Sequence, residues 1–316
     1  MTRRIAFLIY PGFQLLDAAG PIAAFEIAQR HNPGFYALKL VATAPGPVAS
    51  TAGISLLAAP PGSPSAIDTL VIAGGFGSQA VMRCPGTLRF VRACATHARR
   101  VVSICSGAYV LAAAGLLDGK CATTHWSHSA DFARKFPQVR LDADRIFVKA
   151  GKIWSSAGIT AGIDLALALI GEDLGEDIAR RVAQQLVVYH RRPGGQSQFS
   201  PLLEIERPES RFNALLEHVR AHLHHRLSIT ELASHCCMSP RHFSRLFTAE
   251  VGVPPAKAVE RLRVDSARAA LESGAQSIQR VAKQHGFGNP ERMRRSFMRV
   301  LGTPPSRVRR SNGLPV

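Results

Sequence analysis

Residues 228–247, SITELASHCCMSPRHFSRLF, and residues 281–310, VAKQHGFGNPERMRRSFMRVLGTPPSRVRR, repeat one pattern at an offset of fifty positions. Ser239 of the first copy becomes Asn289 in the second, and the other landmarks recur unchanged: Pro240, Arg245, Phe247, Gly252, Pro254 and Pro255 return as Pro290, Arg295, Phe297, Gly302, Pro304 and Pro305. Agreement at this many positions indicates a duplicated structural unit.

The first copy predicts a helix-turn-helix. Ser228 and Glu231 have the spacing of a capping box, which starts a helix by satisfying the backbone N–H groups of its first turn. A turn at residues 235–238 follows. Ser239 and Pro240 then start a second helix, because the serine oxygen caps the first turn and proline fits the first helical position. The expected core residues of this second helix are Phe243, Leu246 and Phe247, and its polar face carries Arg241, Ser244 and Arg245.

The second copy predicts the same unit, with Asn289 and Pro290 starting its second helix. Its expected core residues are Met293 and Phe297, and its polar face carries Glu291, Arg292 and Arg295. Short polar and cationic side chains on such faces reach base edges and phosphates in a DNA major groove. Between the copies, residues 255–273 predict one helix of roughly 28 Å, at 1.5 Å per residue. This length suits two recognition helices that lie about one DNA turn, ~34 Å, apart.

Three segments, SITELASHCCMSPRHFSRLF, ERLRVDSARAALES and the second copy quoted above, resemble the DNA-binding domain of AraC/XylS-type transcriptional regulators. The resemblance implies double-stranded DNA as a partner. Position matching with this family assigns base contacts to Arg241, Ser244, Arg245, Glu291, Arg292 and Arg295. Met293 and Arg294 depart from the family pattern, which has an aromatic and a small polar residue there, so the base preference is not inherited. A solvated helix face is the alternative for any single one of these arginines.

Charge is unevenly distributed along the 316 residues, whose formal net charge is +17. From Arg211 onward there are 18 Lys and Arg against 7 Asp and Glu, whereas residues 1–210 have 21 against 15. Most of the positive charge therefore lies on the last third of the chain, as nucleic-acid binding requires. The length and a hydrophobic content of 46% are sufficient for two domains with buried cores.

No segment has the pattern of a targeting signal or a membrane span. The apolar run Ile5–Tyr10 is shorter than the apolar region of a signal peptide. The cysteines, at positions 84, 94, 105, 121, 236 and 237, do not form a disulfide framework in a chain of this length. We therefore expect a protein of the reducing cytoplasm that does not bind a membrane. Packing is the expected role of Cys236 and Cys237, because no zinc-finger spacing surrounds them, and no metal or cofactor is expected.

Strands alternate with helices in the first part of the chain. Apolar runs typical of buried strands cover residues 4–10, 37–43, 69–73 and 101–104, and helical patterns cover residues 15–28 and 88–100. This alternation predicts a doubly wound α/β domain with a mostly parallel, flavodoxin-like sheet, whose ligands bind at the carboxyl ends of the strands. One strand runs into the loop Gly74–Gly77, where glycines let backbone amides face a pocket.

Cys105 stands at the carboxyl end of the strand at residues 101–104. The order strand, Cys105, Ser106, Gly107 and helix resembles a nucleophile elbow with sulfur in place of oxygen. A thiol there faces the positive end of the following helix, which lowers its pKa and favours the thiolate. A buried structural cysteine is the alternative. Further along the chain, His125 and Trp126 return to this region and are candidates for the same pocket, although His125 could equally be a buried residue at the sheet edge.

Several segments within residues 3–200 resemble the DJ-1/PfpI domain of the class I glutamine-amidotransferase-like fold, in the branch fused to AraC-type domains: YPGFQLLDAAGPIAAFE, VIAGGFG, SICSGAYVLAAAGLLDGKCATTHW, TAGIDLALALIGEDLG and RRPGGQSQFS. The resemblance implies a homodimer and an acidic residue, Asp17, that hydrogen-bonds the elbow Cys105. It extends to isonitrile hydratases, which carry the same acid and cysteine pattern. Ser106 stands where peptidase-like members have a histidine, so an adjacent Cys–His dyad is absent and proteolysis is not expected.

The rest of the first domain predicts a hairpin at residues 145–155 and helices at residues 160–170 and 177–189. The nearby acidic residues indicate a solvated helix junction rather than a metal site: Asp164, Glu172, Asp173, Glu176 and Asp177. The predicted domains are residues 1–190 for the DJ-1/PfpI-like domain and 211–316 for DNA binding. Between them, residues 191–210 are rich in glycine and proline and predict a linker.

Together these patterns predict a sequence-specific transcriptional regulator whose first domain senses a small nitrogenous metabolite without turning it over. The predicted ligand contacts, with Cys105 and Asp17 as a candidate reactive pair, are Asp17, Gly75, Phe76, Cys105, Ser106, His125 and Trp126. Two alternatives stay open: a cysteine-dependent enzyme of the isonitrile hydratase type, and a redox sensor acting through oxidation of Cys105. The duplicated cationic helix-turn-helix favours the regulator, because an enzyme does not need one. Its expected partners are double-stranded DNA, the effector, RNA polymerase and a second copy of the chain.

Overall fold

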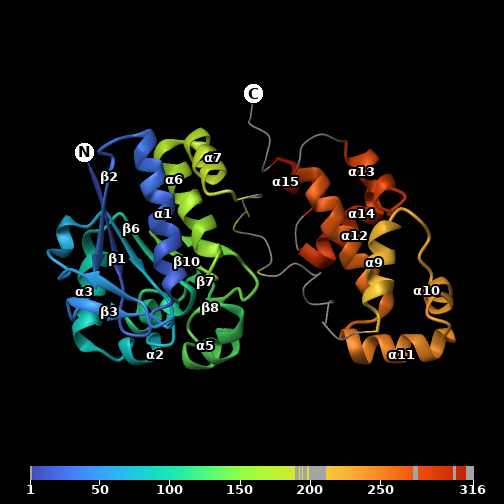
Figure 1. Ribbon diagram of the computed structural model, residues 1–316, viewed down its shortest axis with the longest axis horizontal. Coiled ribbons are helices and arrows are strands. Elements are labelled where there is room, and N and C mark those ends of the chain that lie inside the picture. Colours follow the sequence, from blue (N-terminus) through green and yellow to red (C-terminus); the bar gives the residue numbers. More distant parts are fainter. Residues whose placement is uncertain are drawn as a thin grey trace. The chain divides into compact units, whose positions relative to one another are not determined.

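The computed structural model describes residues 2–188, 192, 194, 198, 211–272, 277–301 and 304–310. The chain divides into two compact units, Met1–Gln198 and Phe199–Val316 (Figure 1). The first unit contains a six-stranded sheet with helices, and the described elements of the second are all helices. The predicted fold class, a doubly wound and mostly parallel domain followed by an all-helical domain with two helix-turn-helix motifs, is confirmed.

The six-stranded sheet has the order β2-β1-β5-β6-β10-β9. Its strands are β1 (Arg3–Leu8), β2 (Tyr36–Val41), β5 (Thr69–Ile72), β6 (Arg100–Ile104), β9 (Phe147–Ala150) and β10 (Ile153–Ser156). Neighbouring strands pair in parallel except β9, which runs antiparallel to β10 and confirms the predicted hairpin. The central strands β5 and β6 are buried at every position, as expected for parallel strands covered on both faces.

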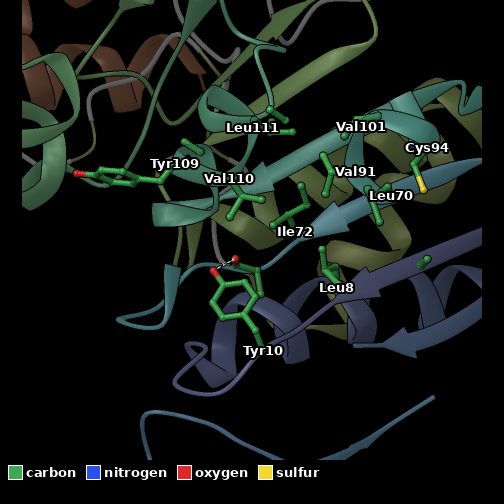
Figure 2. Close-up of a cluster of buried hydrophobic side chains, with 14 of the residues drawn as sticks. Leu8, Tyr10, Leu70, Ile72, Val91, Cys94, Val101, Tyr109, Val110 and Leu111 are labelled. Carbon is green, nitrogen blue, oxygen red and sulfur yellow. Dashed lines mark hydrogen bonds between the residues drawn. The ribbon is translucent and has the colours of Figure 1, made fainter. Parts of the chain in front are cut away.

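Helices cover both faces of the sheet. Helices α1 (Leu15–His31), α6 (Ala161–Leu174) and α7 (Glu176–Gln185) pack on one face with Phe7 of β1. Helices α3 (Pro85–His97) and α4 (Ala108–Ala113) pack on the other with Leu8. Figure 2 shows this second cluster, in which Leu8, Leu70, Ile72 and Val101 from the strands meet Val91, Val110 and Leu111 from the helices. Adjacent strand residues point to opposite faces, so central strands such as β5 and β6 supply both cores.

A second, two-stranded hairpin follows β2 and was not anticipated from the sequence. It joins β3 (Gly46–Ala49) to β4 (Ser55–Ala58). Backbone hydrogen bonds from Gly12 to Ala49 and from Thr51 to Phe13, both 2.8 Å, attach it to the loop after β1. The other described elements of this unit are η1 (Pro64–Ala66), α2 (Ser78–Val81), η2 (Cys105–Gly107), β7 (Cys121–Ala122), η3 (Trp126–His128), α5 (Ser129–Lys135) and β8 (Arg140–Leu141).

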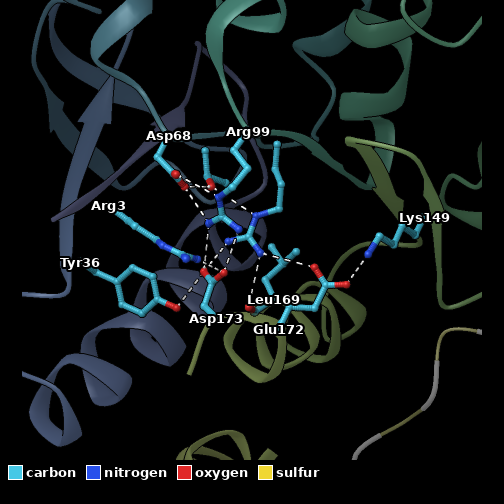
Figure 3. Close-up of polar contacts among 10 residues, drawn as sticks. Arg3, Tyr36, Asp68, Arg99, Lys149, Leu169, Glu172 and Asp173 are labelled. Carbon is cyan, nitrogen blue, oxygen red and sulfur yellow. Dashed lines mark hydrogen bonds and ion pairs between the residues drawn. The ribbon is translucent and has the colours of Figure 1, made fainter. Parts of the chain in front are cut away.

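We expected Asp173, near the end of α6, to lie in a solvated junction between helices, and this expectation was wrong. Its side chain is fully buried and accepts hydrogen bonds from Arg3, Arg99, Arg100 and Tyr36, with distances of 2.9 Å to Arg99 Nη1 and 2.5 Å to Arg100 Nη2 (Figure 3). A buried carboxylate is tolerated when cations and hydrogen bonds compensate its lost hydration. Its arginines come from β1 and from the start of β6, so the local sequence gave no sign of this network.

Asp164, in the first turn of α6, is also buried rather than solvated. It accepts hydrogen bonds from the backbone and side chain of Arg192, at 2.8 and 2.9 Å. Arg192 belongs to the predicted linker, residues 191–210, of which the structure describes only Arg192, Gly194 and Gln198. The rest of that linker lies outside the described residues, and the predicted boundaries at residues 190 and 211 stay a prediction.

The described part of the second unit contains both predicted helix-turn-helix motifs. Its helices are α9 (Asn213–Ala221), α10 (Ile229–His235), α11 (Pro240–Val251), α12 (Pro255–Glu272), α13 (Ile278–Gln284), α14 (Pro290–Leu301) and α15 (Pro305–Arg310). Ser228 and Glu231 form the predicted capping box, and Ser239 accepts a hydrogen bond from the His242 N–H. Asn289 caps α14 in the same way, accepting from the Arg292 N–H at 2.9 Å.

Each motif has its own small core, and α12 supplies both. Ala258 and Leu262, in the first half of α12, belong to the core of the first motif with Leu232, Ala233, Phe243 and Phe247. Val264 and Leu271 belong to the second core with Val281, Ala282, Met293 and Phe297. The predicted spacer is thus one helix of 18 residues, which is about 27 Å long. None of the described helices in either unit is long and apolar enough to span a bilayer.

Candidate functional site

Cys105 lies where the chain turns sharply from β6 into η2. Its φ is +56°, a left-handed conformation that is costly for any residue with a Cβ atom. Two glycines make the turn possible: a Cβ atom on Gly158 would lie 2.1 Å from the Cβ of Cys105, and one on Gly74 would lie 2.6 Å from it. The strand, the strained cysteine and the following helix therefore have the geometry of the predicted nucleophile elbow.

Asp17, in the first turn of α1, lies beside this elbow and is completely buried. Its carboxylate accepts hydrogen bonds from the backbone N–H groups of Ile159, at 2.7 Å, and Gly74, at 3.0 Å. Burial raises the pKa of Asp17 to about 6, although these two bonds and one from the Cys105 thiol oppose the increase. The contact between Asp17 and Cys105 that the family resemblance implied is therefore present.

The Cys105 thiol is held in its protonated form, contrary to our expectation of a thiolate. Burial raises its pKa well above the ordinary value, and the nearby charge of Asp17 adds to this effect. The helix that was expected to favour the thiolate, α4, has only six residues and begins one turn later, at Ala108. Because the thiol is only 6% exposed, the cost of burying a charge exceeds the stabilisation that so short a helix can offer.

Ser106 and the glycine loop are engaged with each other. The Ser106 hydroxyl accepts a hydrogen bond of 2.8 Å from the Gly75 N–H and donates one of 3.0 Å to the Gly75 carbonyl. The Gly74 N–H donates to Asp17, and the Gly77 N–H donates to the Gly12 carbonyl at 3.1 Å. These amides already have partners within the protein, so a ligand carboxylate could bind them only by replacing those partners.

Aromatic side chains are exposed on two loops that border the elbow. Phe76 follows Gly75 and is 80% exposed, and Trp126 is 52% exposed. The second loop is fixed to the elbow by Thr124, whose hydroxyl donates to the Cys105 carbonyl at 3.0 Å. Between Thr124 and Trp126, His125 is half-buried, and its Nδ1 atom lies 2.8 Å from the Ser127 hydroxyl. His125 is therefore not the fully buried residue of our alternative.

Four residues at the elbow were not predicted from the sequence: Tyr10, Thr124, Gly158 and Ile159. Tyr10, at the end of β1, donates from its hydroxyl to the Ala73 carbonyl at 2.6 Å (Figure 2). Burial, Asp17 and Cys105 all raise its pKa. Ile159 has φ +53° and presents its N–H to Asp17. Nothing in the local sequence marks these positions, because their importance arises from contacts with residues far along the chain.

The described residues show no group of three or more His, Cys, Asp or Glu side chains arranged to hold a metal ion.

The candidate DNA-contacting face of the first motif lies on α11. Phe243 and Phe247 turn into the core, which leaves Arg241 and Arg245 exposed on the other side of the helix. The Ser244 hydroxyl donates to the Pro240 carbonyl at 2.8 Å. The two arginines are therefore exposed cations on this helix, and the Ser244 hydroxyl keeps a lone pair for a donor on DNA.

The corresponding face of α14 carries an ion-pair cluster. Glu291 accepts two hydrogen bonds from Arg294, at 2.8 and 2.9 Å, and lies 3.8 Å from Arg295 Nε. Arg292 and Arg295 are exposed, while Met293 is buried. Glu291 therefore orients Arg294 and Arg295 in the free protein, and a direct contact between Glu291 and a base would require Glu291 to leave Arg294.

Two protein-family models match the chain. Residues 3–172 match the DJ-1/PfpI family, and residues 232–311 match a helix-turn-helix domain. Because the first match alone covers more than half of the chain, the protein belongs to the DJ-1/PfpI family. The second match and the relatives over the whole length place it more narrowly: it is an AraC-type DNA-binding transcriptional regulator with a DJ-1/PfpI effector domain.

The relatives differ in how much of the chain they match. The HTH-type transcriptional regulator CdhR of Pseudomonas aeruginosa is 28% identical over 98% of this chain and 92% of its own length. The isonitrile hydratase of Pseudomonas putida is 37% identical, but over 59% of this chain and 78% of the hydratase. A solved structure, a THiJ/PfpI family protein from Pseudomonas syringae, has a TM-score of 0.54 and 25% identity, over 83% of this chain and 90% of that one. The likeness over the whole length is to regulators, and the likeness to an enzyme is partial.

Proposed function

We propose that this regulator binds specific DNA through the exposed faces of α11 and α14 and senses a small nitrogenous metabolite at the Cys105 elbow, without turning it over. The observation that carries the absence of turnover is the burial of Cys105 beside Asp17, which raises the pKa of the thiol. Nucleophilic catalysis needs a thiolate and a base free to accept its proton. Here the thiol pKa is raised, and both Asp17 oxygens accept backbone hydrogen bonds.

The exposed aromatics favour a cationic ligand. Phe76 and Trp126 stand on the loops before α2 and α5, and these helices are joined by a hydrogen bond of 2.9 Å from Lys135 to Gln79. Aromatic faces attract ammonium and quaternary ammonium groups by cation–π contact. The backbone N–H groups of Gly74 and Gly75 already donate hydrogen bonds within the protein, so an anionic ligand has fewer donors to bind. An amine, an amino acid or a quaternary ammonium metabolite suits this arrangement best.

The two recognition helices, α11 and α14, are joined by the rigid helix α12, and a spacer of about 27 Å suits successive major grooves on one face of the duplex. We include the predicted base contacts, Arg241, Ser244, Arg245, Glu291, Arg292 and Arg295, in this proposal. A second copy of the chain and RNA polymerase are the proposed protein partners.

A thermal-shift experiment on the full chain tests ligand sensing. We expect members of a panel of quaternary ammonium compounds and amino acids to raise the Tm, because a ligand that binds only the folded state stabilises it. Trp126→Ala and Phe76→Ala should abolish the increase. Leu57→Ala, which removes a comparably exposed side chain from β4, should leave it unchanged.

The same samples address the enzyme alternative, which the partial match to isonitrile hydratase and the Asp17–Cys105 pair keep open. Consumption of an isonitrile or of a panel compound is measured with wild-type protein and with Cys105→Ser. If the compound is consumed in a reaction that depends on Cys105, at ordinary enzyme rates of ~1 to 1000 per second, the elbow is a catalytic site and not a sensor.

A further inference from the structure

The last described residue of the first unit, Gln198, is bonded to the loop that carries Trp126. The backbone N–H of Trp126 donates to the side-chain oxygen of Gln198 at 3.0 Å. The Gln198 amide nitrogen lies 2.8 Å from the Thr124 carbonyl and 2.9 Å from the Ala143 carbonyl. An amide nitrogen has two hydrogens, so these two closest carbonyls can both be satisfied. One side chain therefore holds together two separate segments, around Thr124 and around Ala143.

Gln198 occupies a special place in the chain. The second unit begins at the next residue, Phe199. On the other side, Thr124 donates its hydroxyl to the carbonyl of Cys105, so only one residue separates Gln198 from the elbow. A change at the elbow that moves Thr124 or Trp126 must therefore either weaken the hydrogen bonds of Gln198 or move Gln198 as well.

A second attachment fixes the same stretch of chain to helix α6 and to the residue before it. Arg192 donates to Asp164 and, at 2.8 Å, to the Thr160 hydroxyl. Thr160 directly follows Ile159, whose N–H binds Asp17. The Gly194 carbonyl accepts from the Phe147 N–H at 3.3 Å, and a Cβ atom on Gly194 would lie 2.6 Å from the Phe147 ring. The described residues of the predicted linker are thus all attached to the first unit. The first of them, Arg192, and the last, Gln198, both contact residues next to the elbow.

From these contacts we infer that Gln198 is a positioning residue that couples the elbow to the point where the chain enters the DNA-binding unit. Occupancy of the site changes the Thr124–Trp126 loop, and the Gln198 amide transmits that change along the chain. The inference rests on the proposed function, because it treats the elbow as the site of effector binding. It adds the residue through which binding is communicated.

The test uses DNA as the ligand, since coupling between two sites is reciprocal and the effector is not needed. The full chain is mixed with the DNA fragment that genomic footprinting recovers, and hydrogen exchange is followed in a peptide spanning residues 123–127. This peptide contains the backbone N–H of Trp126, which donates the hydrogen bond to Gln198. In the wild type, DNA should change the exchange rate of this amide by about fivefold or more, the lower end of typical allosteric couplings. A peptide from β5 should not respond.

Two variants separate coupling from simple stability. Gln198→Ala removes the whole contact, and Gln198→Glu keeps an acceptor for Trp126 but places a carboxylate against two carbonyls. In both variants the backbone N–H of Trp126 should exchange rapidly with or without DNA, because alanine has no acceptor and the two carbonyls repel the carboxylate from its place. DNA affinity itself should be retained. Gln185→Ala, an exposed glutamine of α7, should behave as the wild type.

The inference is overturned if DNA leaves the 123–127 peptide unchanged in the wild type, or if the DNA response persists in Gln198→Ala. Neither result would bear on the thermal-shift experiment, in which a stabilising compound would still support sensing. Conversely, a panel without any stabilising compound would count against the proposed function, while a DNA response lost in Gln198→Ala would still support the coupling.

Discussion

Asp17 in helix α1 and Ile159 after strand β10 are 142 residues apart in sequence, and the Ile159 N–H donates a hydrogen bond of 2.7 Å to the Asp17 carboxylate. This bond fixes the acid in place beside Cys105. The Gly74 N–H donates to the other carboxylate oxygen, so both oxygens of Asp17 have backbone partners beside the Cys105 thiol. The bond therefore ties helix α1 to the segment after β10 and keeps the acid of the elbow beside its cysteine.

The first prediction concerns pH. Since burial raises the pKa of Asp17 from 3.8 to about 6, the folded protein binds more protons at this position than the unfolded chain between those pH values. Stability from Asp17 is therefore fully present at low pH and is lost as the pH rises through about 6, by up to about 3 kcal/mol. Urea denaturation of wild type and Asp17→Asn between pH 4 and 7 measures the difference. A difference that does not change with pH would show that Asp17 titrates normally.

The second prediction concerns thiol reactivity. Cys105 is buried and protonated, whereas Cys237 is exposed. At pH 7.5, iodoacetamide should modify Cys105 about tenfold or more slowly than Cys237, because only an accessible thiolate reacts. Peptide mass spectrometry over time gives both rates. If Cys105 reacted first, the redox-sensor alternative would become the better interpretation.

The third prediction concerns the DNA surface. Arg245→Ala and Arg295→Ala should each weaken binding to the footprinted site by ~1–3 kcal/mol while changing affinity for random DNA much less, if the two side chains contact bases. Fluorescence anisotropy with both DNAs measures this. Arg30→Ala is the control, because Arg30 is an exposed arginine of the first unit, paired with Glu26. Equal losses on both DNAs would make Arg245 and Arg295 phosphate contacts.

The fourth prediction concerns the buried ion-pair network. Asp173→Ala should destabilise the first unit by ~3–5 kcal/mol, because Arg100, which is 3% exposed, loses its closest carboxylate and keeps only Glu172, at 3.9 Å. Asp177→Ala removes an exposed partner of Arg180 and should cost ~1 kcal/mol or less. Chemical denaturation of the two variants provides the comparison. Equal, small effects would mean that the network contributes little to folding.

Local patterns were predictable from the sequence, and distant contacts were not. The caps at Ser228, Ser239 and Asn289 depend on residues three positions away, so the pattern alone predicted both motifs. The acid of the elbow, Asp17, came only from a family resemblance. Ile159 could not be found at all, because its role depends on a backbone N–H whose direction is set by tertiary packing.

Burial explains why three expectations were wrong: the Cys105 thiolate and the solvated positions of Asp164 and Asp173. The sequence placed Cys105 before a helix, which favours a thiolate, but the pKa depends on how much water reaches the sulfur. In the same way, Asp173 stands among acidic residues that look solvated in the sequence. Arginines from β1 and β6 bury it, and their arrival could be known only from the fold.

One experiment tests the central claim that the elbow senses a ligand and the second unit reports it on DNA. Affinity of the full chain for the footprinted site is measured with and without the panel compound that most raises the Tm, while mass spectrometry follows the compound. We predict that the compound changes the DNA affinity about fivefold or more and is recovered unchanged, in the wild type and in Cys105→Ser. Consumption of the compound in a Cys105-dependent reaction, without any effect on DNA affinity, would contradict the account.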